Sequence, residues 1–135
     1  MIWRDGRRWV AVAAAVEVVT GLVLIIRPSL FVWLLFGAEL ATAGQALGRL
    51  AGFSLLALAL ASWPSRGAEK SSMSALRALS VFSLLSALYL AWLGASGGQT
   101  GILLWPAAAI HAGLTIVLAR IWLRGLWKLE EKARL

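Results

Sequence analysis

Four long apolar segments dominate this sequence and restrict what it can fold into. They occupy residues 9–26, 43–63, 74–93 and 101–118, and each approaches the 20 or so residues that cross roughly 30 Å of hydrocarbon as a helix. They make the chain 61% hydrophobic and only 14% charged, whereas an average soluble domain is about one-quarter charged. A soluble fold of 135 residues cannot bury so much apolar surface. The sequence therefore predicts one domain, an all-α bundle of four transmembrane helices.

The basic residues lie on one side of the predicted spans. Only Arg27 and Arg49 fall elsewhere, which leaves eleven of the thirteen lysines and arginines near the termini and in the loop between the second and third spans. Because cytoplasmic loops carry an excess of Lys and Arg, this bias predicts a multi-pass protein of the bacterial inner membrane with both termini cytoplasmic. The cations then act as topology signals and contacts to anionic lipids, and nucleic-acid binding is not expected despite the net charge of +7.

The tryptophans agree with these spans, because the amphipathic indole ring prefers the headgroup level of a membrane. Trp3, Trp9, Trp63, Trp122 and Trp127 fall at the predicted inner ends, and Trp33, Trp92 and Trp105 fall at or near the outer ends. None of the eight lies in the middle of a span.

Two further segments are predicted to lie on the membrane surface. Residues 29–41 (SLFVWLLFGAELA) follow a proline and are too short to span, so we expect an outer interfacial helix with Phe31, Trp33 and Phe36 buried. Residues 119–135 mix Trp and Leu with basic residues, which is typical of an amphipathic helix on the cytoplasmic leaflet. A solvated tail with a few apolar anchors is an equally open interpretation of this second segment.

Three glycines recur at every fourth position near the start of the second span: Gly44, Gly48 and Gly52. Small residues let helix backbones approach closely in lipid, where hydrophobicity alone does not drive helices together. We expect this face to serve helix packing, either within the chain or at a homodimer seam, rather than ligand binding.

Three ionisable side chains fall within the predicted spans, where each costs roughly 2.5–3.5 kcal/mol to insert and marks a candidate site. Glu17 and His111 lie about ten residues from the outer ends of their spans, hence roughly 15 Å deep, and Arg49 lies about six residues in, hence roughly 9 Å deep. Glu17 within the first span also argues for a retained helix rather than a cleaved signal peptide. We expect a Glu17–Arg49 ion pair in a polar pocket that is open to the outer leaflet. Uncharged members of this pocket are expected to be Thr20, Gln45, Ser83, Ser86 and Tyr89.

The pocket has two interpretations from sequence. In the first, it is a functional site, where His111 can exchange a proton near neutral pH and Glu17 can do so if burial favours its protonated form. In the second, a buried ion pair and its hydrogen bonds only fix the register of the helices. One histidine, no cysteine and one intramembrane carboxylate do not make a metal or haem site, so no cofactor is expected. With no catalytic triad and no phosphate-binding loop, the sequence does not favour an enzyme.

A first span that carries Glu17 and Gly21 and ends at Pro28 is followed by Gly-Arg-Leu-Ala-Gly at 48–52 and by His111 in the fourth span. In these elements, spread over most of the chain, the sequence resembles the DoxX-like group of small four-helix bacterial membrane proteins. The glutamate of the first span is also similar to that of the small multidrug resistance transporters. Arg49, His111 and a charge bias that forbids dual topology depart from that second family.

These features leave three hypotheses for function. The first is a non-enzymatic membrane protein, either an accessory or scaffold subunit of a larger complex or a bundle that binds a lipid or lipophilic small molecule. The second is a proton-coupled transporter or channel that uses Glu17 and His111. The third is a membrane enzyme that acts on a lipid or quinone.

Overall fold

A computed structural model describes residues 2–64, 69–98 and 101–133. Over these residues the chain is all-helical and forms five helices, which are α1 (Ile2–Ile26), α2 (Pro28–Phe36), α3 (Thr42–Ser62), α4 (Glu69–Ala95) and α5 (Leu104–Ala133). Four of them contain segments long and apolar enough to cross a membrane: Gly6–Ile26, Thr42–Ser62, Met73–Ala95 and Leu104–Arg124. The prediction of an all-α bundle with four candidate spans is therefore confirmed.

Prolines set two of the helix boundaries. A residue that precedes proline is pushed out of the helical conformation, and α1 accordingly stops before Arg27-Pro28. Pro28 then occupies the first turn of α2, where its missing N–H breaks no helical hydrogen bond. The same effect ends α3 at Ser62, because Trp63 is extended before Pro64. At the other end of α2, Gly37 adopts the left-handed conformation (φ 68°) and its N–H donates to the Trp33 carbonyl at 2.8 Å.

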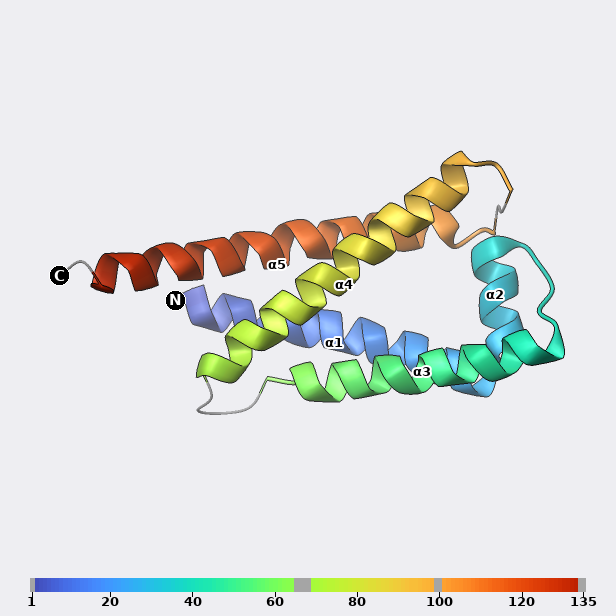
Figure 1. Cartoon of the computed structure of the whole chain (residues 1–135), viewed down its shortest axis with the longest axis horizontal. Helices are drawn as coiled ribbons and strands as arrows, with labels where there is room; N and C mark the ends of the chain where they lie inside the picture. Colours follow the sequence, from blue (N-terminus) through green and yellow to red (C-terminus); the bar gives the residue numbers. More distant parts are fainter. Residues whose placement is uncertain (1, 65–68, 99–100, 134–135) are drawn as a thin grey trace.

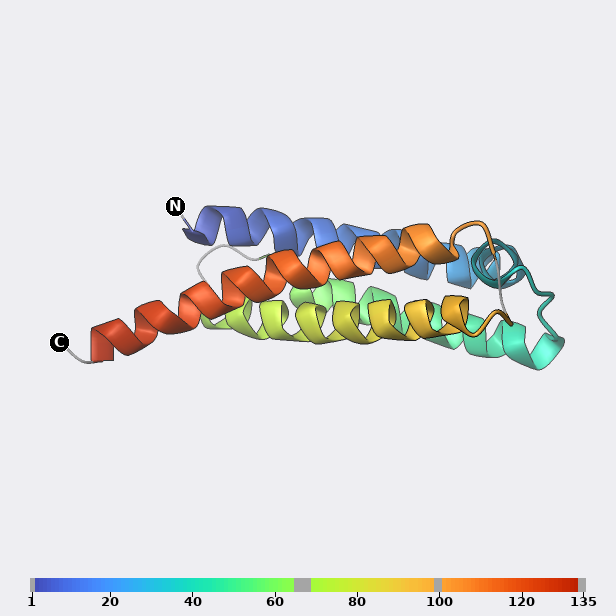
Figure 2. The ribbon, with the colours of Figure 1, turned by 90° about the horizontal axis from the view of Figure 1, so that it is seen from above.

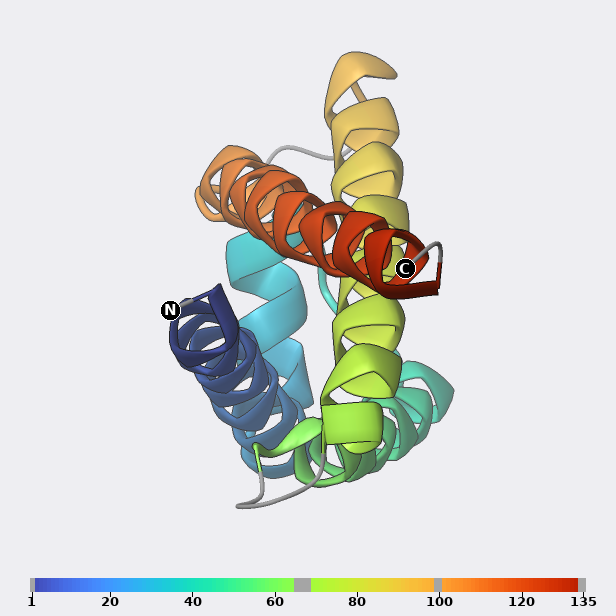
Figure 3. The ribbon, with the colours of Figure 1, turned by 90° about the vertical axis from the view of Figure 1, so that its left-hand side faces the viewer.

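The four long helices run lengthwise and α2 crosses one end of the bundle (Figures 1 and 2). We call this end the α2 end, and the opposite end, where α1 starts and α5 finishes, the termini end. The most closely packed pairs are α1 with α3 and α4 with α5, each antiparallel. Figure 1 shows that α4 is inclined, so that α3 and α4 diverge toward the α2 end. The view along the bundle shows the same divergence (Figure 3).

The glycine face of α3 packs on α1. A Cβ atom added to Gly52 would lie 2.7 Å from the Gly21 carbonyl oxygen, and one added to Gly48 would lie 2.9 Å from Pro28 Cβ. Gly44 instead lies against the Leu40 side chain of the α2–α3 connection. Gly48 and Gly52 thus lie against other helices of the same chain, at distances that leave no room for a side chain.

The α4–α5 pair packs on α1 through an apolar cluster near the termini end. Its buried members are Val10, Ala13, Ala75, Leu76, Leu79, Leu114 and Leu118. They come from α1, α4 and α5, so this cluster joins the two helix pairs into one bundle.

At the α2 end of the bundle, helix α2 packs on α4 and α5. Leu35 forms a small buried cluster with Leu90 and Ala108, and Phe31 and Phe36 pack against this cluster half-buried. Trp33, in contrast, is 57% exposed in the protein alone, and its burial in the membrane surface stays a prediction. The difference arises because α2 turns only one side toward the bundle and Trp33 lies on the other side.

The C-terminal segment does not form a separate helix. Residues 119–133, expected to form an amphipathic helix on the membrane surface, continue α5 without a break. The last turns of α5 project beyond the start of α1 at the termini end (Figure 2).

Candidate functional site

Glu17 lies inside the bundle. It follows Ala13 of the apolar cluster by four residues and therefore lies on the same face of α1, one turn closer to the α2 end. The side chain is only 1% exposed, and its Oε1 atom has no hydrogen-bond partner. Ala13 and Ala14, which precede Glu17 by about one turn, are fully buried as well.

Two serines of α4 are likewise buried without a hydrogen-bond partner. Ser83 follows Leu79 of the apolar cluster by four residues and is fully buried. Ser80, one turn earlier on the same helix, is 6% exposed. Neither hydroxyl oxygen has a hydrogen-bond partner. The sequence analysis identified Ser83 but missed Ser80, although spacing by three residues puts both serines on one helix face.

His111 is the corresponding residue of α5. It precedes Leu114 of the apolar cluster by three residues, so it too lies one turn closer to the α2 end. Its ring meets Phe82 of α4 edge-on, with ring centroids 5.9 Å apart, and its Nδ1 atom is buried without a hydrogen-bond partner. The backbone carbonyl of His111 accepts a hydrogen bond from the Thr115 hydroxyl at 2.8 Å.

These four residues form what we call the interior polar layer: Glu17, Ser80, Ser83 and His111. Each of these residues lies about one helical turn from a member of the apolar cluster, on the side nearer the α2 end. Two of them, Glu17 and Ser83, are among the most fully buried side chains of the described residues. The layer contains a carboxyl group, two hydroxyl groups and an imidazole ring at neighbouring levels of the bundle, each with a polar atom that forms no hydrogen bond within the protein.

Arg49 is not part of this layer. Its Nε atom donates to the Ile25 carbonyl at 3.3 Å, at the end of α1, and the side chain is exposed. The predicted Glu17–Arg49 ion pair is therefore absent, since Ile25 lies eight residues beyond Glu17, or roughly 12 Å along the helix. The depth estimate was wrong because α3 begins beyond the end of α1, so that Gly48 is level with Pro28.

The other predicted members of the pocket are more peripheral. Tyr89 is 58% exposed and stacks on Trp92 of its own helix. Gln45 is half-buried, one turn nearer than Arg49 to the start of α3. Thr20 and Ser86 are half-buried on α1 and α4, one turn from Glu17 and Ser83 respectively, and border the interior polar layer.

An apolar groove runs along the outer face of α1. It has a volume of about 390 Å³ and is lined by Val12, Ala15, Val16, Val19 and Thr20. Val12 and Val19 are 47% and 62% exposed, so the groove lies on the outer face of α1, whereas Glu17 shares the buried face with Ala13.

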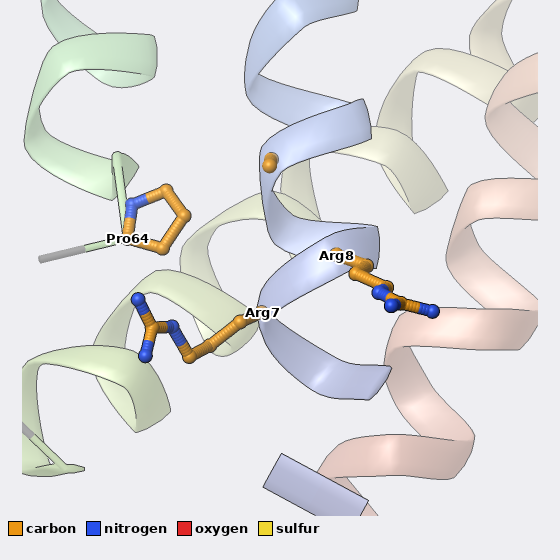
Figure 4. Close-up of a pocket in the computed structure, with 4 residues that line it drawn as sticks. Arg7, Arg8 and Pro64 are labelled. Atoms are coloured by element: carbon orange, nitrogen blue, oxygen red, sulfur yellow. The ribbon is translucent and has the colours of Figure 1, made fainter. Parts of the chain in front are cut away.

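A second recess of about 300 Å³ lies at the termini end, lined by Arg7, Arg8, Ala11 and Pro64. Arg7 extends beneath Pro64, whereas Arg8 points away from Pro64 toward α5 (Figure 4). The described lining includes two cations and no carboxylate, so this recess is positively charged. Nearby in the fold, the Arg77 guanidinium of α4 lies 5.5 Å from the centre of a Trp122 ring of α5, a cation–π contact that the sequence analysis missed.

Over the described residues, no three His, Asp or Glu side chains come together as they would around a metal ion. Comparisons with family models, curated proteins and solved structures find no match to the chain. The likeness to the DoxX-like group therefore remains a prediction from the sequence.

Proposed function

We propose that this chain is a non-enzymatic, multi-pass membrane protein whose interior polar layer binds the polar end of a lipid or small lipophilic molecule. The observation that carries the proposal is the set of four buried polar atoms without hydrogen-bond partners: Glu17 Oε1, Ser80 Oγ, Ser83 Oγ and His111 Nδ1. A layer that only fixed helix register would be expected to pair these groups with one another.

The energetics favour a ligand of mixed polarity. A buried donor or acceptor without a partner costs roughly 1–3 kcal/mol, so four of them in one layer are a substantial destabilising feature. A small head group that offers both donors and acceptors would offset this cost. The exposed apolar side chains of the bundle, among them those of the groove on the outer face of α1, suit the hydrocarbon part of such a molecule.

The test is to identify what copurifies with the protein. Wild type, Glu17→Leu and Glu39→Gln are purified in mild detergent and extracted, and the extracts are compared by untargeted mass spectrometry. Glu39 is an exposed carboxylate outside the helices, so its variant is the matched control. We expect one lipophilic species near equimolar amount in wild type and Glu39→Gln, and its loss from Glu17→Leu. No enriched species in wild type, or equal amounts in all three proteins, would overturn the proposal.

A proton-coupled carrier is the second candidate, because Glu17 and His111, two groups that exchange protons, share the interior polar layer. In reconstituted vesicles, this function requires substrate-dependent proton movement that Glu17→Gln abolishes. A variant that moves protons like wild type would exclude it.

We also propose that the chain lies in a bacterial inner membrane with both termini cytoplasmic and α2 at the outer surface. The eleven cations near the termini and the loop between the second and third spans support this orientation. The chain has no cysteine, so single cysteines introduced at Ser74 and Ser96 can report it cleanly. In intact cells whose outer membrane has been permeabilised, an impermeant maleimide should label the cysteine at 96 and spare that at 74. The reverse labelling pattern would show that the orientation is the opposite of the one proposed.

A further inference from the structure

Two arginines lie close together on the outside of the bundle at the α2 end. Arg27 follows the last residue of α1, and Arg49 lies in the second turn of α3. Two observations show that the chain around Arg27 lies against the chain around Arg49. Arg49 Nε donates to the Ile25 carbonyl at 3.3 Å, and a Cβ atom on Gly48 would lie 2.9 Å from Pro28 Cβ. Both arginine side chains are exposed.

These arginines are unusual in their position. They lie at the α2 end, whereas in the sequence the other eleven of the thirteen cations fall near the termini or in and beside the segment between α3 and α4. The hydrogen bond to Ile25 uses Arg49 Nε and holds the guanidinium at the end of α1. The bond uses only the Nε–H of the five N–H donors, and the N–H groups of the two terminal nitrogens can bind an oxyanion.

The neighbouring surface sets the depth of the pair. The first candidate span ends at Ile26, immediately before Arg27. Ile26 is 69% exposed, and Leu47 and Leu50, which flank Arg49 on α3, are 66% and 59% exposed. An apolar surface of this kind faces acyl chains, so the two guanidinium groups lie where hydrocarbon gives way to headgroups.

We propose that Arg27 and Arg49 form a binding site for the phosphate of a phospholipid in the leaflet at the α2 end. Guanidinium groups bind phosphate oxygens through short, charge-assisted hydrogen bonds, often two at a time. Ile26, Leu47 and Leu50 would contact the acyl chains of the same lipid, which a soluble phosphate could not exploit. The site is separate from the interior polar layer and does not depend on the function proposed for that layer.

Native mass spectrometry of the purified protein tests this site. The probes are phosphatidylglycerol and a diacylglycerol with the same acyl chains but no phosphate. Wild type should retain phosphatidylglycerol in preference to diacylglycerol. The Arg27→Gln/Arg49→Gln variant should bind phosphatidylglycerol about tenfold more weakly or worse. The matched control, Arg120→Gln/Arg124→Gln, removes the same charge from exposed sites on α5 and should retain the lipid.

Three results would overturn the proposal. They are unchanged lipid binding by Arg27→Gln/Arg49→Gln, an equal loss in the α5 control, and displacement of phosphatidylglycerol by excess inorganic phosphate. Arg27→Gln alone keeps the Arg49–Ile25 hydrogen bond, so it serves if the double variant does not fold. It should lower the affinity for phosphatidylglycerol several-fold, and binding equal to wild type would count against the site.

Discussion

Replacing Gly52 with alanine should weaken the bundle by separating α1 from α3. The added Cβ would lie 2.7 Å from the Gly21 carbonyl oxygen, about 0.7 Å short of the 3.4 Å at which ordinary contact begins, and 2.8 Å from Ile25 Cγ1. A backbone carbonyl cannot rotate away as a side chain can, so the helices must move apart along their contact. Overpacking of this kind costs about 1–3 kcal/mol.

The control is Gly113→Ala on α5, because a Cβ atom there meets nothing within 4 Å. Both variants gain the same helix propensity, up to about 1 kcal/mol, so the difference between them isolates the packing cost. Reversible unfolding in detergent, followed by tryptophan fluorescence, measures it. We expect Gly52→Ala to be less stable than Gly113→Ala by about 1–3 kcal/mol.

Gly21→Ala provides a second measurement of the same contact, since its Cβ would lie 2.8 Å from the Gly52 carbonyl oxygen. Once either alanine has separated the helices, the second should cost less, so the double variant should be less destabilised than the sum of the two single variants. Equal stability of Gly52→Ala and Gly113→Ala, or strict additivity of the pair, would refute the reasoning.

Three further predictions concern other parts of the bundle. In protein freed of bound lipid, Glu17→Leu should leave the unfolding free energy unchanged or raise it by about 1–3 kcal/mol, because it removes an unpartnered buried oxygen, and a clear loss of stability would contradict this. Gly101→Ala should melt at a lower temperature than Gly98→Ala, because its Cβ would overlap the Leu34–Leu35 backbone and disturb the Leu103 N–H to Leu34 carbonyl bond (2.9 Å), whereas Gly98 adjoins open space. Arg77→Gln should lose about 0.5–1 kcal/mol of stability with its cation–π contact to Trp122, and the exposed Arg124→Gln should lose less.

The helices could be predicted from the sequence because hydropathy is a local property. Each candidate span is a run of about 20 apolar residues, and prolines at 28 and 64 mark two helix ends through their effect on the preceding residue. The burial of Glu17 was also predictable, since Ala13 and Ala14 next to it are small residues that suit helix contact.

The partner of each helix face depended on the tertiary structure. The spacing of Gly44, Gly48 and Gly52 is equally suited to another helix of the chain or to a second copy. Only the approach of Gly52 to Gly21 shows that α1 occupies this face. Likewise, Ser80 and Ser83 are ordinary residues of an apolar helix until the folded bundle buries their hydroxyl groups.

The ionisable residues of the apolar helices show most clearly what the sequence determined and what the tertiary structure decided. The sequence alone determined that Glu17, Arg49 and His111 fall within apolar helices, because that depends only on their neighbours in the chain. It could not determine their relative depths, because counting from each helix start assumes that all helices start at one level. The tertiary structure decided that α3 extends beyond α1. That offset leaves Glu17 and His111 in the interior polar layer and carries Arg49 to the end of α1, where it binds the Ile25 carbonyl.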